Sequence, residues 1–67
     1  MTNKDATKKL KELRTFYGVT LWELSEELGI SKTTLWRIEN GFGPKPDFEE
    51  RRRIQRTIVN IAGRKTT

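Results

Sequence analysis

The side chains able to do chemistry in this sequence are almost all lysines, arginines and carboxylates. Fourteen Lys and Arg residues stand against nine Asp and Glu, giving a formal net charge of +5. The basic residues gather at the N-terminus and in the ranges 32–45 and 51–56, whereas the range 20–28 holds acids and no base. An excess of positive charge favours binding of a polyanion such as nucleic acid, although a merely solvated basic surface has the same composition.

The same inventory argues against catalysis and metal binding. The chain has no His and no Cys, which removes the usual general base, the thiol nucleophile and the ligands of structural zinc. Glu26 and Glu27 are adjacent on a predicted helix, so the two carboxylates point in different directions. We therefore expect no enzymatic activity, no cofactor and no metal. No apolar run reaches the roughly 18 residues of a membrane span, and no signal peptide is visible, so we expect a cytoplasmic protein.

Helical periodicity and capping residues predict an all-α fold. A first helix covers about 5–17 and stops at Gly18, where a glycine suits a left-handed end. A last helix begins at the cap Asp47 and covers 47–62, after a loop over 41–46 that its prolines and glycines keep from being helical. The apolar positions expected to form the core are Leu10, Leu13, Phe16, Tyr17, Leu21, Leu24, Leu28, Ile30, Leu35, Ile38, Ile54, Ile58 and Ile61.

Two shorter helices joined by a tight turn lie between these long ones. Thr20 and Glu23 fit a capping box at the start of a helix that Gly29 ends after about two turns. Ser31 caps the next helix, which covers about 32–39. Helices this short are not stable alone in water and form only when packed on others, which is how a helix-turn-helix is built. In that motif the first helix crosses the DNA backbone and the second enters the major groove.

The run from Thr20 to Gly41 resembles the helix-turn-helix of the phage repressor and Cro proteins, the XRE-like family. The resemblance extends to Leu10 through Arg14 before this run and to Pro46 and Ile54 after it, and so covers about three quarters of the chain. It implies one lambda-repressor-like domain over residues 1–67, and from the residues themselves we expect 1–4 and 63–67 to be frayed tails. Its architecture would be a compact bundle of four short helices, or five with a further C-terminal helix. The matching residues within the run are Thr20, Glu23, Leu24, Ser25, Leu28, Gly29, Ile30, Ser31, Leu35, Ile38, Glu39, Asn40 and Gly41.

The resemblance also implies which residues meet DNA. Base readers would be Lys32, Thr33 and Arg37, since Lys and Arg donate to guanine O6 and N7 and a Thr methyl can meet thymine. An ion pair between Arg14 and Glu39 would be structural, joining the scaffold to the reading helix. Contacts to phosphates, which fix the register without reading sequence, are implied for Thr20, Asn40 and Lys45.

The outer face of the helix-turn-helix departs from the family pattern. Leu21 stands where the family usually has a Gln that often touches DNA. Trp22 and Trp36 lie on the sides of their helices that face away from the predicted core. Three interpretations stay open for these rings: packing along neighbouring methylene stems, contact of Trp36 with a thymine methyl or sugar edge, or a protein-partner surface.

Two functions follow from this reading of the sequence. The first is a sequence-specific transcriptional regulator, such as a repressor, of phage or mobile-element type. It would bind double-stranded DNA in a bacterial or phage-infected cell with its reading helix, 32–39. The family alone implies a homodimer on DNA, because nothing after Ala62 indicates a dimerisation helix. The second is an antirepressor or adaptor of the same fold that binds a protein partner through Trp22 and Trp36.

Overall fold

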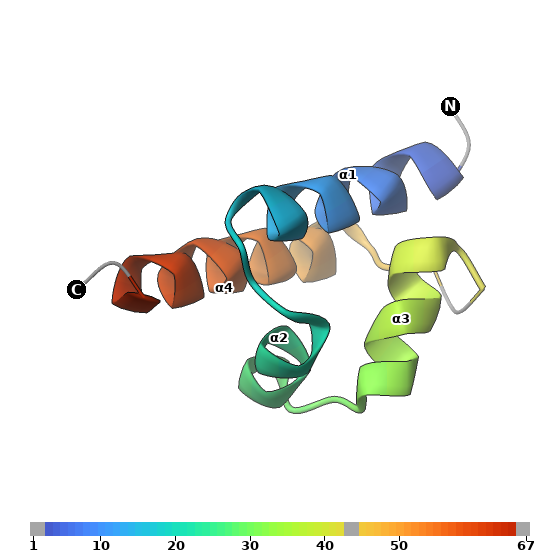
Figure 1. The fold of residues 1–67 in the computed structure, drawn as a ribbon. Helices are drawn as coiled ribbons and strands as arrows, with labels where there is room; N and C mark the ends of the chain where they lie inside the picture. The colour runs from blue at the N-terminus through green and yellow to red at the C-terminus, as the bar shows by residue number, and fades with distance from the viewer. Residues whose placement is uncertain (1–2, 43–44, 66–67) are drawn as a thin grey trace.

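Four helices make up the part of the chain that the computed structural model describes, residues 3–42 and 45–65. In chain order they are α1 (Asn3–Phe16), α2 (Leu21–Leu28), α3 (Lys32–Asn40) and α4 (Phe48–Lys65) (Figure 1). These residues contain no strand. The predicted small all-α bundle is therefore confirmed, with four helices over the described ranges.

The ends of the two short helices are set by local hydrogen bonds. The Thr20 hydroxyl accepts from the Glu23 amide at 3.1 Å, and the Glu23 carboxylate accepts from the Thr20 amide at 2.9 Å, which completes a capping box on α2. Gly29 then ends α2 with a φ of 71°, in the left-handed region that only glycine adopts without strain. Ser31 caps α3 by accepting from the Thr34 amide at 3.0 Å.

The long helices form the support on which the short pair rests. α1 and α4 run side by side, and both contact the short helices (Figure 1). α3 packs on α1, α2 packs on α4, and the two short helices pack on each other. Each short helix thus gains the tertiary contacts that its own few turns of hydrogen bonds could not replace.

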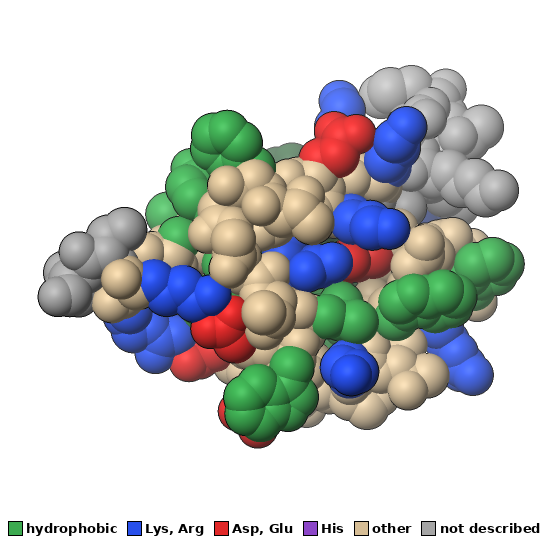
Figure 2. All heavy atoms as spheres, viewed as in Figure 1, with side chains coloured by type: hydrophobic (Ala, Val, Ile, Leu, Met, Phe, Trp, Pro, Cys, Tyr) green, Lys and Arg blue, Asp and Glu red, His purple; other side chains and the backbone are tan. Residues whose placement is uncertain are grey.

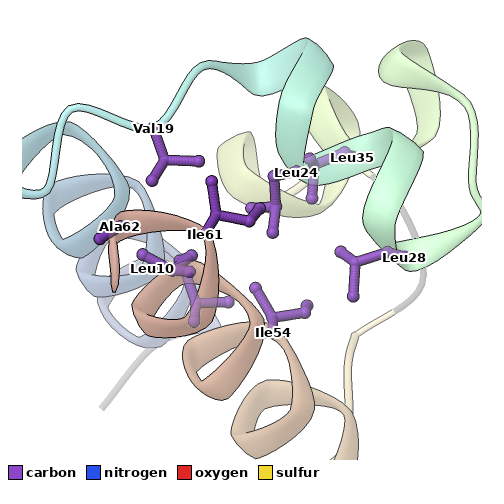
Figure 3. Packing of buried hydrophobic residues seen from close by; sticks show 9 residues of the cluster. Leu10, Val19, Leu24, Leu28, Leu35, Ile54, Ile61 and Ala62 are labelled. Atoms are coloured by element: carbon purple, nitrogen blue, oxygen red, sulfur yellow. The ribbon is translucent and has the colours of Figure 1, made fainter. Parts of the chain in front are cut away.

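The core lies where the four helices meet (Figure 3). Each helix contributes one fully buried aliphatic side chain, and burying such a group contributes about 1.5–3 kcal/mol. These four are Leu10, Leu24, Leu35 and Ile58. The rest of the buried cluster is Val19, Leu28, Ile54, Ile61 and Ala62, with Leu13, Leu21 and Ile30 packed against it in partly buried positions.

The end of α1 differs from the expectation that Phe16 and Tyr17 join the core. Phe16 is 80 % exposed and Tyr17 40 %, and the two rings meet edge to face at 5.3 Å. At about 100° per residue, Phe16 lies about 120° around the helix from the buried Leu10, so it points outward. Tyr17 follows the last residue of α1 and lies in the turn that includes Gly18, so the helical spacing no longer sets the direction of its side chain. Val19 takes the buried position instead.

α4 also differs from expectation, because it continues to Lys65, three residues past the expected end at Ala62. Gly63 lies within this helix and has open space where a side chain would be. The expected tail residues 66–67 and 1–2, and loop residues 43–44, lie outside the described residues. Within the described ranges, no helix is both long and apolar enough to cross a membrane.

Candidate nucleic-acid interface

The outer face of α3 carries the three side chains expected to read bases. Lys32, Thr33 and Arg37 are all exposed, whereas Leu35 on the opposite side is fully buried. At about 100° per residue, the three polar side chains span an arc of about 140° on the solvent side of the helix. Trp36 falls inside that arc, so a bulky ring shares the face with the cations. Figure 2 shows basic and hydrophobic side chains next to one another over α3.

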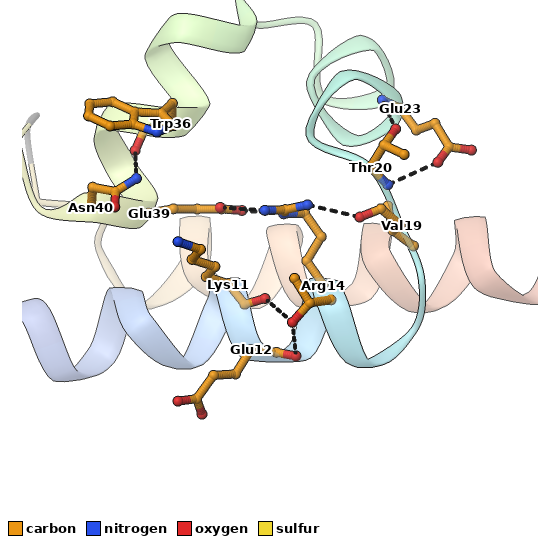
Figure 4. A network of polar contacts seen from close by, with 10 residues as sticks. Lys11, Glu12, Arg14, Val19, Thr20, Glu23, Trp36, Glu39 and Asn40 are labelled. Carbon is orange, nitrogen blue, oxygen red and sulfur yellow. Dashed lines mark hydrogen bonds and ion pairs between the residues drawn. The ribbon is translucent and has the colours of Figure 1, made fainter.

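A buried ion pair fixes the C-terminal end of α3 to α1. Arg14 Nε lies 2.8 Å from Glu39 Oε2, and Arg14 Nη2 lies 3.1 Å from Glu39 Oε1, a two-point contact (Figure 4). The third donor, Nη1, meets the Val19 carbonyl at 3.0 Å. The side chains are only 12 % and 2 % exposed. The guanidinium therefore joins three segments, and the pair implied by the family resemblance lies inside the scaffold rather than on the exposed face of α3.

The N-terminal end of α2 exposes Thr20 next to a carboxylate whose pKa is lowered. Its partner in the capping box, Glu23, accepts a hydrogen bond from Lys65 Nζ at 2.6 Å. That bond, followed by the bond from the Thr20 amide, lowers the pKa of Glu23 from 4.5 to about 2. Lys65 Nζ also donates to the Gly18 carbonyl at 2.7 Å. The end of α4 thus holds the start of α2, where a phosphate contact by Thr20 is expected.

The other two expected phosphate contacts flank the end of α3. Asn40 is half-buried, and its Nδ2 donates to the Trp36 carbonyl at 2.8 Å (Figure 4). One amide hydrogen is thereby used inside the helix, which leaves the second hydrogen and the amide oxygen for other contacts. Lys45 is exposed in the segment that leads to α4.

Comparison with protein families identifies this arrangement. The family model described as a helix-turn-helix domain matches residues 7–63, which include most of α1, the pair α2–α3 and most of α4. The chain belongs to the helix-turn-helix domain family. It is an XRE-like member, and such domains bind DNA. Neither the comparison with curated proteins nor that with solved structures gave a match.

The two tryptophans of this helix-turn-helix domain lie in different surroundings. Trp22 on α2 is 60 % exposed, and Trp36 on α3 is 47 % exposed. The Trp36 ring stacks on Phe42, with ring centroids 5.6 Å apart and planes within 6° of parallel. Phe42 follows the left-handed Gly41, and no periodic pattern in the sequence distinguishes it. Phe42 is thus a neighbour of Trp36 that none of the three interpretations of the Trp36 ring includes.

Sequence reasoning also missed the residues by which α4 braces the helix-turn-helix. Lys65 bonds to the start of α2, Arg64 pairs with Glu27 on its flank, and Arg53 donates to the Leu28 carbonyl at 3.4 Å at its end. One signal was available: the acid-only range 20–28 needs a basic partner, and the C-terminal bases are the natural candidates. The expectation that residues 63–67 form a frayed tail leaves these bases out of consideration as partners.

Proposed function

We propose that this helix-turn-helix protein is a sequence-specific transcriptional regulator of phage or mobile-element type. It would bind double-stranded DNA with α3 in the major groove. The observation that carries the proposal is the exposed face of α3, which the buried Arg14–Glu39 pair joins to α1 from behind. A preorganised reading helix loses little conformational freedom on binding, so its contacts contribute to affinity more fully.

Each expected contact has a chemical role in this proposal. Lys32 and Arg37 donate to guanine O6 and N7, and the Thr33 methyl meets a thymine methyl. Thr20 on one side of the reading helix, with Asn40 and Lys45 on the other, meets phosphates and fixes the register.

Selection of short duplexes from a random pool tests the proposal. The wild type should enrich one sequence at moderate salt. Arg37→Ala should reduce discrimination at one base pair by about 1–3 kcal/mol. Lys45→Ala should weaken binding to all sequences alike and lower the salt slope by about 1. Arg56→Ala on α4 is the charge-matched control and should leave the preferred sequence unchanged. Failure of the wild type to enrich any sequence would contradict the proposal.

A footprint on the enriched duplex addresses the oligomeric state. Two copies related by a two-fold axis protect two half-sites about one helical turn, or a multiple of it, apart. We propose such a homodimer on DNA from the family resemblance. A single unrepeated footprint would contradict it.

A second candidate function is an antirepressor or adaptor that binds a protein partner. The exposure of Trp22 and of the Trp36–Phe42 stack favours it, because large exposed aromatic side chains are enriched at protein interfaces. Trp22→Ala and Trp36→Ala separate the two candidates. Loss of a partner complex with DNA binding intact would support the adaptor, whereas loss of DNA affinity with Trp36→Ala would support the regulator.

A further inference from the structure

A groove of about 550 Å³ runs between α1 and the C-terminal end of α3, beside the reading face. None of the DNA-contact roles above makes use of it as a site. From α1 it is lined by Lys8, Lys11 and Glu12, and from the α3 end by Glu39, Asn40 and Phe42. Its walls thus combine two lysines and two carboxylates with an amide and an aromatic ring.

The charges along the groove favour an anion. Glu39 is already neutralised by Arg14 through the two-point contact, so its carboxylate does not oppose one. Lys8 and Lys11 are exposed, and neither forms an ion pair with another residue of the described ranges. Figure 4 shows the Lys11 side chain extending from α1 toward Glu39 and Asn40. Together with Glu12 the two lysines leave a net positive charge.

The position of the groove identifies the anion. An α-helix with its side chains is about 10–12 Å wide and fills a major groove about 12 Å wide, so both DNA backbones run close to its flanks and ends. The groove opens at the C-terminal end of α3, next to Asn40. A backbone that passes Asn40 therefore meets Lys11 within the same surface.

The aromatic wall is held in place before any ligand arrives. Phe42 stacks on Trp36 with nearly parallel planes, so its ring is fixed relative to α3 although it lies beyond the helix end. A deoxyribose offers an apolar face of suitable size for such a ring, and the adjacent phosphate needs cations. Aromatic and basic walls side by side suit one nucleotide of backbone better than a free anion.

We propose that this groove seats a phosphodiester of the DNA backbone. Lys11, with Lys8, supplies the charge, and Phe42 packs on the neighbouring sugar. The proposal rests on the docking of α3 described under Proposed function and adds α1 to the DNA interface. The competing anionic occupant is an acidic polypeptide, and the experiment below distinguishes it from DNA.

Salt-dependent DNA binding by matched lysine variants tests the groove. Lys11→Gln should weaken binding to specific and nonspecific duplexes alike, roughly two- to fivefold at low salt. It should also make the slope of log K against log salt shallower by about 0.9, the contribution of one neutralised phosphate. Lys9→Gln removes the same charge from an exposed position of α1 that does not line the groove, so its slope should stay at the wild-type value. Glu12→Gln should tighten binding.

Three results would overturn the groove proposal. The first is an equal slope for Lys11→Gln and Lys9→Gln. The second is the absence of amide chemical-shift changes at Lys11 and Phe42 when duplex is added. The third is that poly-glutamate shifts these two residues while duplex does not. Nonspecific duplex suffices for the first two measurements. If the wild type enriches no sequence, the proposed regulator fails while the groove is still tested.

Discussion

Charged pairs join the helix-turn-helix to its support in two regions, and the two are built differently. At the α1–α3 junction, Arg14 and Glu39 are nearly excluded from water and share two hydrogen bonds. At the α2–α4 junction, Glu23–Lys65 and Glu27–Arg64 lie in partly or largely exposed positions. A buried pair cannot lose one partner without stranding a charge, whereas an exposed pair returns its partner to water. Breaking the pair at the α3 end should therefore cost more stability than breaking either pair on the α2 side.

The largest effect on stability is expected when the buried pair is broken. Arg14→Leu leaves the Glu39 carboxylate buried without a counter-charge and also removes the bond to the Val19 carbonyl. We expect the free energy of unfolding to fall by about 3–5 kcal/mol. A chain of this size has a total stability of only about 3–10 kcal/mol, so the loss is a large fraction of the total. Urea denaturation followed by circular dichroism measures the change.

The double variant Arg14→Leu/Glu39→Leu is the control for that loss. Replacing both members of a buried pair by apolar residues is often neutral or stabilising, so the double variant should recover most of the stability. If both variants were equally unstable, packing around Arg14, rather than the stranded charge, would be the cause.

A smaller effect is expected at the partly exposed pair, where it appears as pH dependence. The folded-state pKa of Glu23 is lowered to about 2, chiefly by Lys65 and next by the Thr20 amide. A lowered pKa stabilises the folded state fully above about pH 4.5, and this contribution is lost as the pH falls toward 2. The free energy of unfolding should therefore drop over that interval, and the drop should be smaller in Glu23→Gln.

A titration by NMR assigns the cause of that shift. Lys65→Gln should raise the pKa of Glu23 toward 4.5, whereas Lys9→Gln, distant in sequence and exposed on α1, should leave it unchanged. An unchanged pKa in Lys65→Gln would mean that the capping box alone holds the carboxylate ionised.

The smallest effect is expected at the most exposed pair, Glu27–Arg64. Arg64→Gln should lower the free energy of unfolding by about 0.2–1 kcal/mol at low salt, and the difference from wild type should disappear at 1 M salt. Parallel urea titrations at the two salt concentrations measure it. A loss that persists at high salt would show that Arg64 contributes through packing rather than through its exposed charge.

The boundaries of α2 and α3 could be predicted because their causes are local. The Thr20–Glu23 box, the Ser31 cap and the left-handed Gly29 each depend on residues within four positions of one another. The four-helix bundle followed, since short capped helices must pack on longer ones. The pair Arg14–Glu39 spans 25 positions and was expected from the family resemblance, not from any local pattern.

The missed features have causes that no local window contains. Gly63 suggested a helix end, because glycine destabilises a helix by about 1 kcal/mol relative to alanine. The helix continues because Lys65 finds partners on α2 and at Gly18, 42 and 47 positions away. The helical spacing of Phe16 predicts a core position, yet only the packing direction of α1 decides which way its side chain points. The Trp36–Phe42 stack depends on the path of the chain after Gly41.

Trp36, stacked on Phe42, is also suited to serve as an intrinsic fluorescence probe. The chain contains two tryptophans, and Trp22→Phe would leave Trp36 as the single emitter. Its indole sits half in water, in the middle of the surface that a duplex would cover, with a second ring held parallel beside it. Exclusion of solvent from that indole should move its emission to shorter wavelength. Occupancy of the reading face could then be followed in real time without attaching a dye.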